Sequence, residues 1–310
     1  MNKGLKFITP ILILITIFCV AAINKNAPLK YLQKKGVRKI VIDAGHGGSD
    51  YGASGAYSYE KNVSLAVALK LEQLIKKEIG DVEVYMTRTE DFYDNVKVKA
   101  NKANAAGGDL FISIHCNDAP AKRGREIVGY ENKRVKKKGK WRTVQVPQYR
   151  YYTIPTSAKG TETYIWGINK NDDKERALRE NQDLMSDSSM DNDLKNFDPY
   201  SPEQAIAISL RTQQYAERSI NLAYNVQEEF INIGRSNRDV RQRGVGIWVL
   251  QAVAMPAILV ELGFISNPEE EAYLNSEDGQ NALAGAIAKA VKKYKEGIET
   301  KIKSTQQASR

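Results

Sequence analysis

The sequence predicts an α/β fold, in which a single domain contains a mostly parallel central sheet flanked by helices. Two observations support this prediction. Apolar, β-branched runs at 40–42 and 110–114 have the composition of buried strands. Between them lie segments whose apolar residues repeat at helical spacing, so strand and helix alternate in this part of the chain. This alternation is typical of βαβ units, whose parallel strands are joined by crossover helices.

The elements of the first half follow one another in this pattern. The first strand ends at Gly45-His46-Gly47-Gly48. These glycines permit backbone angles that other residues resist, and we expect them to let backbone or a substrate approach closely. The remaining elements are a helix at 62–79, a strand at 82–86, a helix at 95–106 and a third strand at 109–115.

The second half of the chain continues the alternation after an interruption. The segment 119–160 is basic and rich in tyrosine, and we expect it to leave the sheet. The elements predicted beyond it are a strand at 161–166, a helix at 172–185, a long amphipathic helix at 202–231, strands at 245–249 and 257–260, and a closing helix at 281–294.

The positive charge of the chain is concentrated in one segment. The formal net charge is +9, but residues 122–160 contain twelve Lys and Arg against two Glu, a net charge of +10. The rest of the chain therefore sums to −1, which does not favour a nucleic-acid-binding body. The basic segment could bind a polyanion or an anionic lipid, and a solvated basic loop explains it equally well. The two cysteines do not indicate a disulfide-built scaffold.

The N-terminus indicates export. Lys3 and Lys6 precede an apolar run at 7–23, so we expect 1–24 to be a signal peptide or an uncleaved membrane anchor. We assign 25–36 to a linker, 37–295 to the folded domain and 296–310 to a polar tail that frays. The expected location is the periplasm or cell envelope, with membrane contact only through the N-terminal segment.

Both histidines of the chain follow predicted strands, His46 after the first and His115 at the end of the third. Ligands of parallel sheets bind at the carboxyl ends of the strands, so both imidazoles should lie at one rim. Two imidazoles and a carboxylate form a common zinc ligand set. Glu60 is the candidate third ligand, although a glutamate at a helix start also complements the helix dipole.

Glu261 is a fourth candidate, because it ends the predicted strand 257–260. A carboxylate at this rim could accept a proton from an attacking water molecule. It could equally cap the turn at 266–268, and spacing alone leaves both interpretations open.

Four ordered motifs resemble the zinc-dependent N-acetylmuramoyl-L-alanine amidases of the type-3 family. They are the segments 42–48, 60–62, 111–117 and 260–269, with further matching pieces at 87–91 and 160–164. The resemblance extends from about residue 38 to about residue 294.

This resemblance implies a function and a role for each candidate residue. Family members cleave the amide between N-acetylmuramic acid and L-alanine of the peptidoglycan stem. His46, Glu60 and His115 match the ligands of one zinc ion, and Glu261 matches the catalytic glutamate. Cys116 stands where a small residue is usual. It could be a fourth ligand, but we expect a buried bystander, because a closed site could not activate water. A wall-binding regulator without activity and a zinc carboxypeptidase acting on stem peptides are the competing functions.

The resemblance also suggests regulation. In the branch of the family that acts in daughter-cell separation, a segment before the long helix blocks the site until a protein activator binds. The segment 167–201 is comparable, and its predicted helix carries several acids. We hypothesise that Glu180 reaches the zinc and inhibits the resting enzyme. A solvated acidic helix accounts for the same charges equally well.

Overall fold

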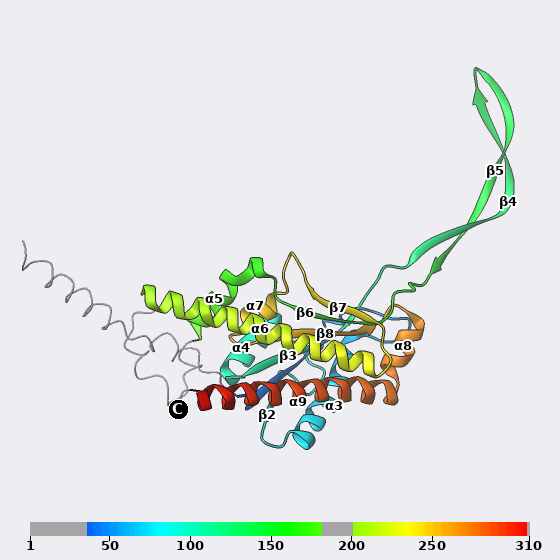
Figure 1. Ribbon diagram of the computed structural model, residues 1–310. Coiled ribbons are helices and arrows are strands. Elements are labelled where there is room, and N and C mark those ends of the chain that lie inside the picture. The colour runs from blue at the N-terminus through cyan, green and yellow to red at the C-terminus, as the bar shows by residue number, and fades with distance from the viewer. Residues whose placement is uncertain (1–35, 182–200, 309–310) are drawn as a thin grey trace, which may run out of the picture.

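A six-stranded sheet runs through the middle of the computed structural model, which describes residues 36–181 and 201–308 (Figure 1). The signal or anchor at 1–24, and all but the last residue of the linker at 25–36, lie outside the described residues. In spatial order the strands are β2 (Glu83–Met86), β1 (Lys39–Ala44), β3 (Leu110–Asn117), β8 (Ala257–Phe264), β6 (Thr161–Ile165) and β7 (Asn237–Gln242).

The sheet is mostly parallel, which confirms the predicted fold class. Strands β2, β1, β3 and β8 run in one direction, and β6 pairs antiparallel with β8 and parallel with β7. The register places His115 of β3 opposite Glu261 of β8, and Glu261 opposite Glu162 of β6. The carboxyl ends of β1, β3 and β8 therefore form one rim, as expected for parallel strands.

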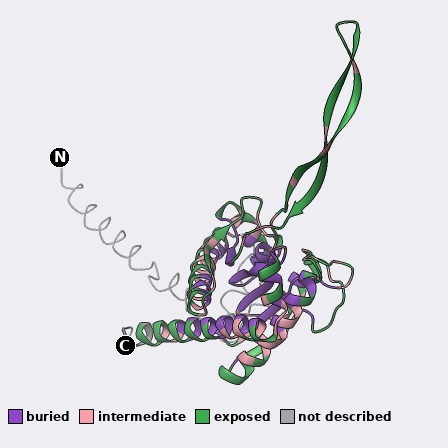
Figure 2. Cartoon of the chain, turned by 90° about the vertical axis from the view of Figure 1, so that its right-hand side faces the viewer, coloured by how far each residue is buried: buried purple, intermediate pink, exposed green. Residues whose placement is uncertain are grey.

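Helices cover both faces of the sheet, and alternate residues of each strand point to opposite layers. Ile112 and Ile114 of β3 belong to the core shared with α3 (Glu60–Glu78), α6 (Pro202–Asn232) and α9 (Glu277–Ala308). Phe111 of the same strand packs in the core on the other face, with α4 (Val96–Ala106) and α7 (Trp248–Ala252). Figure 2 shows the buried residues in the sheet and on the helix sides that face it.

The prediction of a strand at 245–249 is wrong. Val245 is 88% exposed and Gly246 has a φ of +79°, so a turn precedes the short helix α7. Val249, Leu250 and Val253 are buried at helical spacing, which explains why this apolar run forms a helix and not a strand. The strand of this region is instead β7, whose sequence NRDVRQ lacks an apolar run because it lies at the edge of the sheet.

The prediction that the chain frays from residue 296 onward is also wrong, because α9 continues to Ala308. Tyr294, Ile298 and Ile302 repeat every four residues and pack against the core. The Nζ atom of Lys295 lies 2.8 Å from Asp81 and 2.6 Å from Glu299. A helix that the sequence did not indicate, α8 (Pro268–Asn275), precedes α9, and Asn267 caps it by accepting a hydrogen bond from the Glu269 amide.

The basic segment leaves the sheet, as predicted, and forms a two-stranded antiparallel ribbon. Its strands are β4 (Lys122–Lys137) and β5 (Lys140–Ile154), joined by a turn in which Lys138 and Gly139 both have positive φ. Figure 1 shows the ribbon projecting far from the body, and Figure 2 shows it exposed from base to tip.

The described part of the chain, which excludes the apolar run at 7–23, contains no helix with the length and hydropathy needed to cross a bilayer.

Candidate metal centre

The turn after β1 carries the first candidate ligand in a left-handed backbone conformation. His46 has a φ of +56°, which is uncommon for a residue other than glycine, and Gly47 and Gly48 also have positive φ. In this conformation the ring of His46 lies 5.0 Å from that of His115, centroid to centroid.

Two glycines make room for the ligands themselves. A Cβ atom on Gly45 would lie 2.5 Å from the ring of His115, and one on Gly52 would lie 2.6 Å from both Glu60 and His46. Gly45 thus lets the ring of His115 lie against the turn that carries His46, with the two ring centroids 5.0 Å apart.

The structure brings His46, Glu60 and His115 together, with one potential ligand atom from each lying within 4.8 Å of the others. Nε2 of His46 lies 3.1 Å from one oxygen of Glu60, and Nδ1 of His115 lies 2.7 Å from the other. The backbone amides of Ala53 and Cys116 also donate to Glu60. Burial disfavours the charge of Glu60, but hydrogen bonds from His115 and His46 hold its pKa well below the usual range. The carboxylate is therefore ionised and available to a cation.

Asp50 contacts the candidate ligand His46, although nothing in the sequence singled it out. Its Oδ2 atom lies 2.8 Å from Nδ1 of His46, which leaves Nε2 of that ring directed at Glu60. Histidine ligands commonly donate their second ring N–H to a carboxylate, which fixes the tautomer and orientation of the ring. The spacing of four residues between His46 and Asp50 is the sequence feature that connects them.

Replacing Asp50 with Asn is expected to weaken metal binding about 10- to 100-fold, because the ring of His46 loses its charged acceptor. Competition with a chromogenic chelator measures this change. Asp118→Asn, in the loop after β3, is the matched control. Equal affinities of the Asp50→Asn variant and the unmodified chain would contradict the assigned role.

Acid is expected to weaken the binding of a metal such as zinc at this centre. Burial lowers the pKa of His46, but Glu60 and Asp50 raise it overall to about 8 in the metal-free site. A zinc ion binds only the neutral ring, so below pH 8 binding must expel a proton and the apparent affinity falls about tenfold per pH unit. Chelator competition from about pH 6 to about pH 9 tests this expectation. A constant affinity over that range would contradict it.

Two buried cations, Arg88 and Lys99, hold the backbone of the turn that carries His46. Arg88, which follows β2, donates to the carbonyl oxygens of Ala44 and Gly45 at 3.0 and 2.8 Å. Lys99 of α4 donates to the carbonyl oxygens of Ala44 and His46 and forms an ion pair with Asp43 at 3.0 Å. The motif at 87–91 thus has a physical role, because it fixes the backbone that presents His46.

Glu261 lies beside the three candidate ligands, in register with His115. Its Oε2 atom is buried and has no hydrogen-bond partner among the described residues, and its Oε1 atom lies 3.9 Å from a guanidinium nitrogen of Arg243. Burial raises the pKa of Glu261 to about 7. Asn267 caps the following turn, so the alternative role considered for Glu261 is already filled.

Glu162, opposite Glu261 in the sheet, differs sharply from it in environment. Asn117, Tyr164 and Arg238 donate hydrogen bonds to Glu162 at 2.8, 2.7 and 2.7 Å. Burial opposes ionisation of Glu162, but Tyr164 and Arg238 lower its pKa overall. Of these two facing carboxylates, Glu261 is therefore the one able to exchange a proton near neutral pH.

Cys116 points away from the centre. It follows His115 in β3 and packs in the core on the opposite face, with Ile114 and Val260. Burial raises the pKa of its thiol, so this side chain is a neutral core residue, as expected.

The loop before Glu60 is fixed by a residue that lies more than two hundred positions away. Glu271 of α8 accepts hydrogen bonds from the backbone amides of Ala56, Tyr57 and Ser58 and from the Ser58 hydroxyl. The unpredicted helix α8 therefore helps to position the first residue of α3, which is Glu60.

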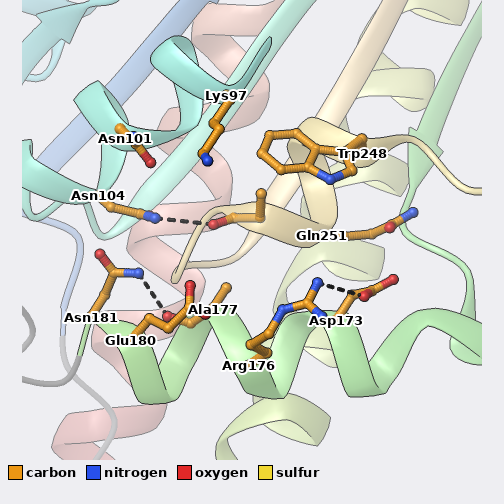
Figure 3. A pocket seen from close by; sticks show the side chains of 11 residues that line it. Lys97, Asn101, Asn104, Asp173, Arg176, Ala177, Glu180, Asn181, Trp248 and Gln251 are labelled. Carbon is orange, nitrogen blue, oxygen red and sulfur yellow. Dashed lines mark hydrogen bonds and ion pairs between the residues drawn. The ribbon is translucent and has the colours of Figure 1, made fainter.

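The structure does not bring Glu180 to this centre. Glu180 ends α5 (Asn171–Glu180) and lines a polar pocket between α4, α5 and α7, which none of the three candidate ligands lines (Figure 3). Helix α5 is held there by Lys174, whose Nζ atom donates to the carbonyl oxygens of Leu250, Val253 and Met255. The hypothesis that Glu180 reaches the zinc is thus not supported, and residues 182–200 of the expected inhibitory segment lie outside the described residues.

Glu180→Ala is expected to leave zinc affinity and hydrolysis unchanged within about twofold, because surface substitutions away from the site have small effects. Glu175→Ala on the same helix is the matched control. A specific rise in hydrolysis for Glu180→Ala would restore the inhibitory hypothesis.

Metal-dependent hydrolases commonly combine a three-residue ligand set with a nearby carboxylate, and the rim of this chain carries side chains of the same kinds. A family model described as N-acetylmuramoyl-L-alanine amidase matches residues 40–293. The chain belongs to this amidase family, as the sequence motifs implied.

Individual relatives support the assignment. The amidase AmiC of Escherichia coli O6:H1 is 32% identical over 256 residues, which cover 82% of this chain and 52% of the relative. AmiC of Neisseria meningitidis is 31% identical over 261 residues, with 82% and 52% coverage. The chain thus spans about half the length of these curated relatives.

Solved structures show the same fold. An N-acetylmuramoyl-L-alanine amidase from Clostridium difficile 630 is 24% identical, with a TM-score of 0.53 and coverage of 84% of this chain and 97% of that one. The CwlD amidase of Clostridioides difficile, solved in complex with the GerS lipoprotein, is 21% identical, with a TM-score of 0.51 and 83% and 98% coverage.

Proposed function

We propose that this chain is a zinc-dependent peptidoglycan amidase that hydrolyses the amide bond between N-acetylmuramic acid and L-alanine of the stem peptide. Membership of the amidase family supports the reaction. The observation that carries the proposal is the meeting of His46, Glu60 and His115 beside a buried Glu261 oxygen that has no partner among the described residues.

The donor set fits zinc. Two imidazoles and one carboxylate form a common catalytic zinc ligand set, which leaves a coordination position open. Glu60 is ionised and His46 has its second ring nitrogen fixed by Asp50, so both can act as ligands. When bound, the ion would polarise the scissile carbonyl and make an attacking water molecule more acidic.

Glu261 would transfer the proton. A pKa near 7 suits a group that must accept a proton in one step and release it in the next. In this mechanism Glu261 accepts a proton from the attacking water and delivers it to the departing amine of L-alanine. Arg243, whose guanidinium group faces Glu261 and lies over the ring of Tyr164, would hold the carboxylate at the rim.

Analysis of the products separates this function from the alternatives. Digestion of purified sacculi should release intact stem peptides with new L-alanine N-termini. A carboxypeptidase would release single amino acids, and a regulator without activity would release nothing. The digest should stop when a chelator is added. Activity that survives complete metal removal would overturn the zinc mechanism.

The setting of the reaction follows from the substrate. We infer that the chain is exported and acts in the periplasm or cell envelope, in wall remodelling or daughter-cell separation. The GerS complex of the CwlD amidase supports a protein activator as a partner class. The N-terminal segment at 1–24 would serve export or membrane anchoring.

A further inference from the structure

The β4–β5 ribbon has two chemically different faces, which its register defines. Directly opposed residues of an antiparallel pair lie on the same face, and alternate residues lie on opposite faces. A bulge between Ile127 and Gly129 shifts β4 by one residue. With that shift, four of the five aromatic residues of the ribbon share one face, here called the aromatic face: Tyr130, Trp141, Tyr149 and Tyr151.

The same face carries positive charge and no acid. Its basic residues are Arg123, Arg125, Arg134 and Lys136, whereas both acids of the ribbon, Glu126 and Glu131, lie on the opposite face. Side-chain contacts agree with this assignment. Arg125 lies over the ring of Tyr149 at 4.5 Å, Arg134 over Trp141 at 5.6 Å, and the rings of Tyr149 and Tyr151 are 6.4 Å apart. On the opposite face, Arg150 pairs with Glu126.

No part of the body described by the structure covers this face. Tyr130, Trp141 and Tyr151 are 63%, 59% and 67% exposed, and Figure 2 shows the whole ribbon clear of the domain. Exposed aromatic residues beside arginine have the composition of binding interfaces, in which tyrosine, tryptophan and arginine are enriched.

We propose that the aromatic face binds the glycan strands of peptidoglycan, away from the metal centre. Aromatic rings can stack on the apolar faces of sugar rings, and tyrosine and tryptophan can also donate to hydroxyl groups. The basic residues would pair with the carboxylates of the stem peptides. The aromatic residues follow the ribbon from base to tip, as a linear polymer requires. This inference rests on the proposed function, since the polymer is the substrate of the metal centre.

The chemistry of the tip argues against insertion into a membrane. The turn is formed by Lys137, Lys138, Gly139 and Lys140, and a charged turn does not enter the apolar part of a bilayer. A membrane anchor would instead gather its aromatic residues at the tip. Here Tyr149 and Tyr151 lie nearer the base, so the glycan polymer fits the arrangement better.

Pelleting with purified sacculi tests the proposal in the full chain carrying Glu261→Gln, which keeps the polymer uncut. The aromatic-face variant combines Tyr130→Thr, Trp141→Thr and Tyr149→Thr, because threonine preserves strand propensity. The matched control on the opposite face combines Val144→Thr, Val146→Thr and Tyr152→Thr. We expect the first variant to lose about tenfold or more in affinity for sacculi, and the control to lose less than about twofold.

A second pair of variants separates recognition from net charge. Arg125→Gln, Arg134→Gln and Lys136→Gln remove three charges from the aromatic face, and Lys133→Gln, Lys140→Gln and Arg142→Gln remove three from the opposite face. A larger loss for the first set supports the proposal. Equal losses would mean that binding depends only on total charge and would overturn it.

Vesicles and a small substrate complete the experiment. Binding to vesicles of roughly one part phosphatidylglycerol to three parts phosphatidylcholine should not change in the aromatic-face variant. If that variant lost more affinity for these vesicles than for sacculi, the proposal would be overturned. Hydrolysis of a soluble N-acetylmuramoyl-L-alanyl peptide by the unmodified chain reports on the proposed function separately. If that hydrolysis occurs while the face variants bind sacculi normally, only the ribbon proposal fails.

Discussion

Glu261→Gln is expected to lower hydrolysis of sacculi by about 10²- to 10⁴-fold while zinc stays bound. Glutamine keeps the size of the side chain but cannot accept a proton at neutral pH, and Glu261 has a buried oxygen with no partner among the described residues. A loss of about a thousandfold would correspond to about 4 kcal/mol of transition-state stabilisation. The three candidate ligands beside Glu261 are unchanged in this variant, so its metal content should not fall.

Release of L-alanine N-termini and metal analysis on the same preparation measure both parts of this result. Glu269→Gln, at an exposed position in the first turn of α8, is the control for loss of a carboxylate near the end of β8. If the Glu261→Gln enzyme retained more than about a tenth of the activity, Glu261 would not be the proton acceptor.

His115→Ala is expected to abolish stoichiometric zinc binding, whereas Cys116→Ala should leave it intact. The two residues are adjacent in β3 but point to opposite faces of the sheet, His115 toward Glu60 and Cys116 into the core. Loss of a ligand should exceed the roughly 10- to 100-fold effect of losing a residue that only orients one. His115 is preferred to His46 for this test, because alanine at the positive φ of His46 would add backbone strain.

Metal analysis after dialysis, together with circular dichroism, distinguishes loss of the ion from loss of the fold. The Cys116→Ala variant serves as the matched control, since it makes a small cavity in the core without touching the centre. Zinc loss in Cys116→Ala with full retention in His115→Ala would reverse the ligand assignment.

The first half of the fold was predictable because its signals are local. Strands β1 and β3 can be recognised from their apolar runs. Helices α3 and α4 can be recognised from apolar residues that repeat at helical spacing within a short window. The strand ends then place His46 and His115 at one rim without further information. Helix α9 shows the limit of this reasoning, because its last turns are polar in composition and only their packing against the core extends the helix.

The edge of the sheet was not predictable in the same way. Strand β7 is largely charged, since an edge strand needs few apolar residues, and the apolar run that follows it forms a turn and the short helix α7. The arginines of β7 include Arg238, which donates a hydrogen bond to Glu162 in the neighbouring strand β6. Such charge pairs depend on which strands become neighbours, and periodicity carries no information about that order.

The residues that support the site were the least visible in the sequence. Asp50 orients His46, and Glu271 holds the loop before Glu60 through contacts across more than two hundred positions. Glu180 could not be placed from the sequence for a different reason, because charge patterning indicates that a helix is acidic but not where it packs. Helix α5 is placed by the buried Lys174 and its three carbonyl partners.

Anomalous diffraction at the zinc edge, from crystals of the zinc-loaded protein, tests the central claim most directly. The account predicts one strong peak, about 2.0–2.2 Å from a ring nitrogen of His46, a ring nitrogen of His115 and a carboxylate oxygen of Glu60. Glu261 should lie nearby without binding the ion. A peak bound to Cys116 or to Glu261, or no peak between the two imidazoles, would contradict the account.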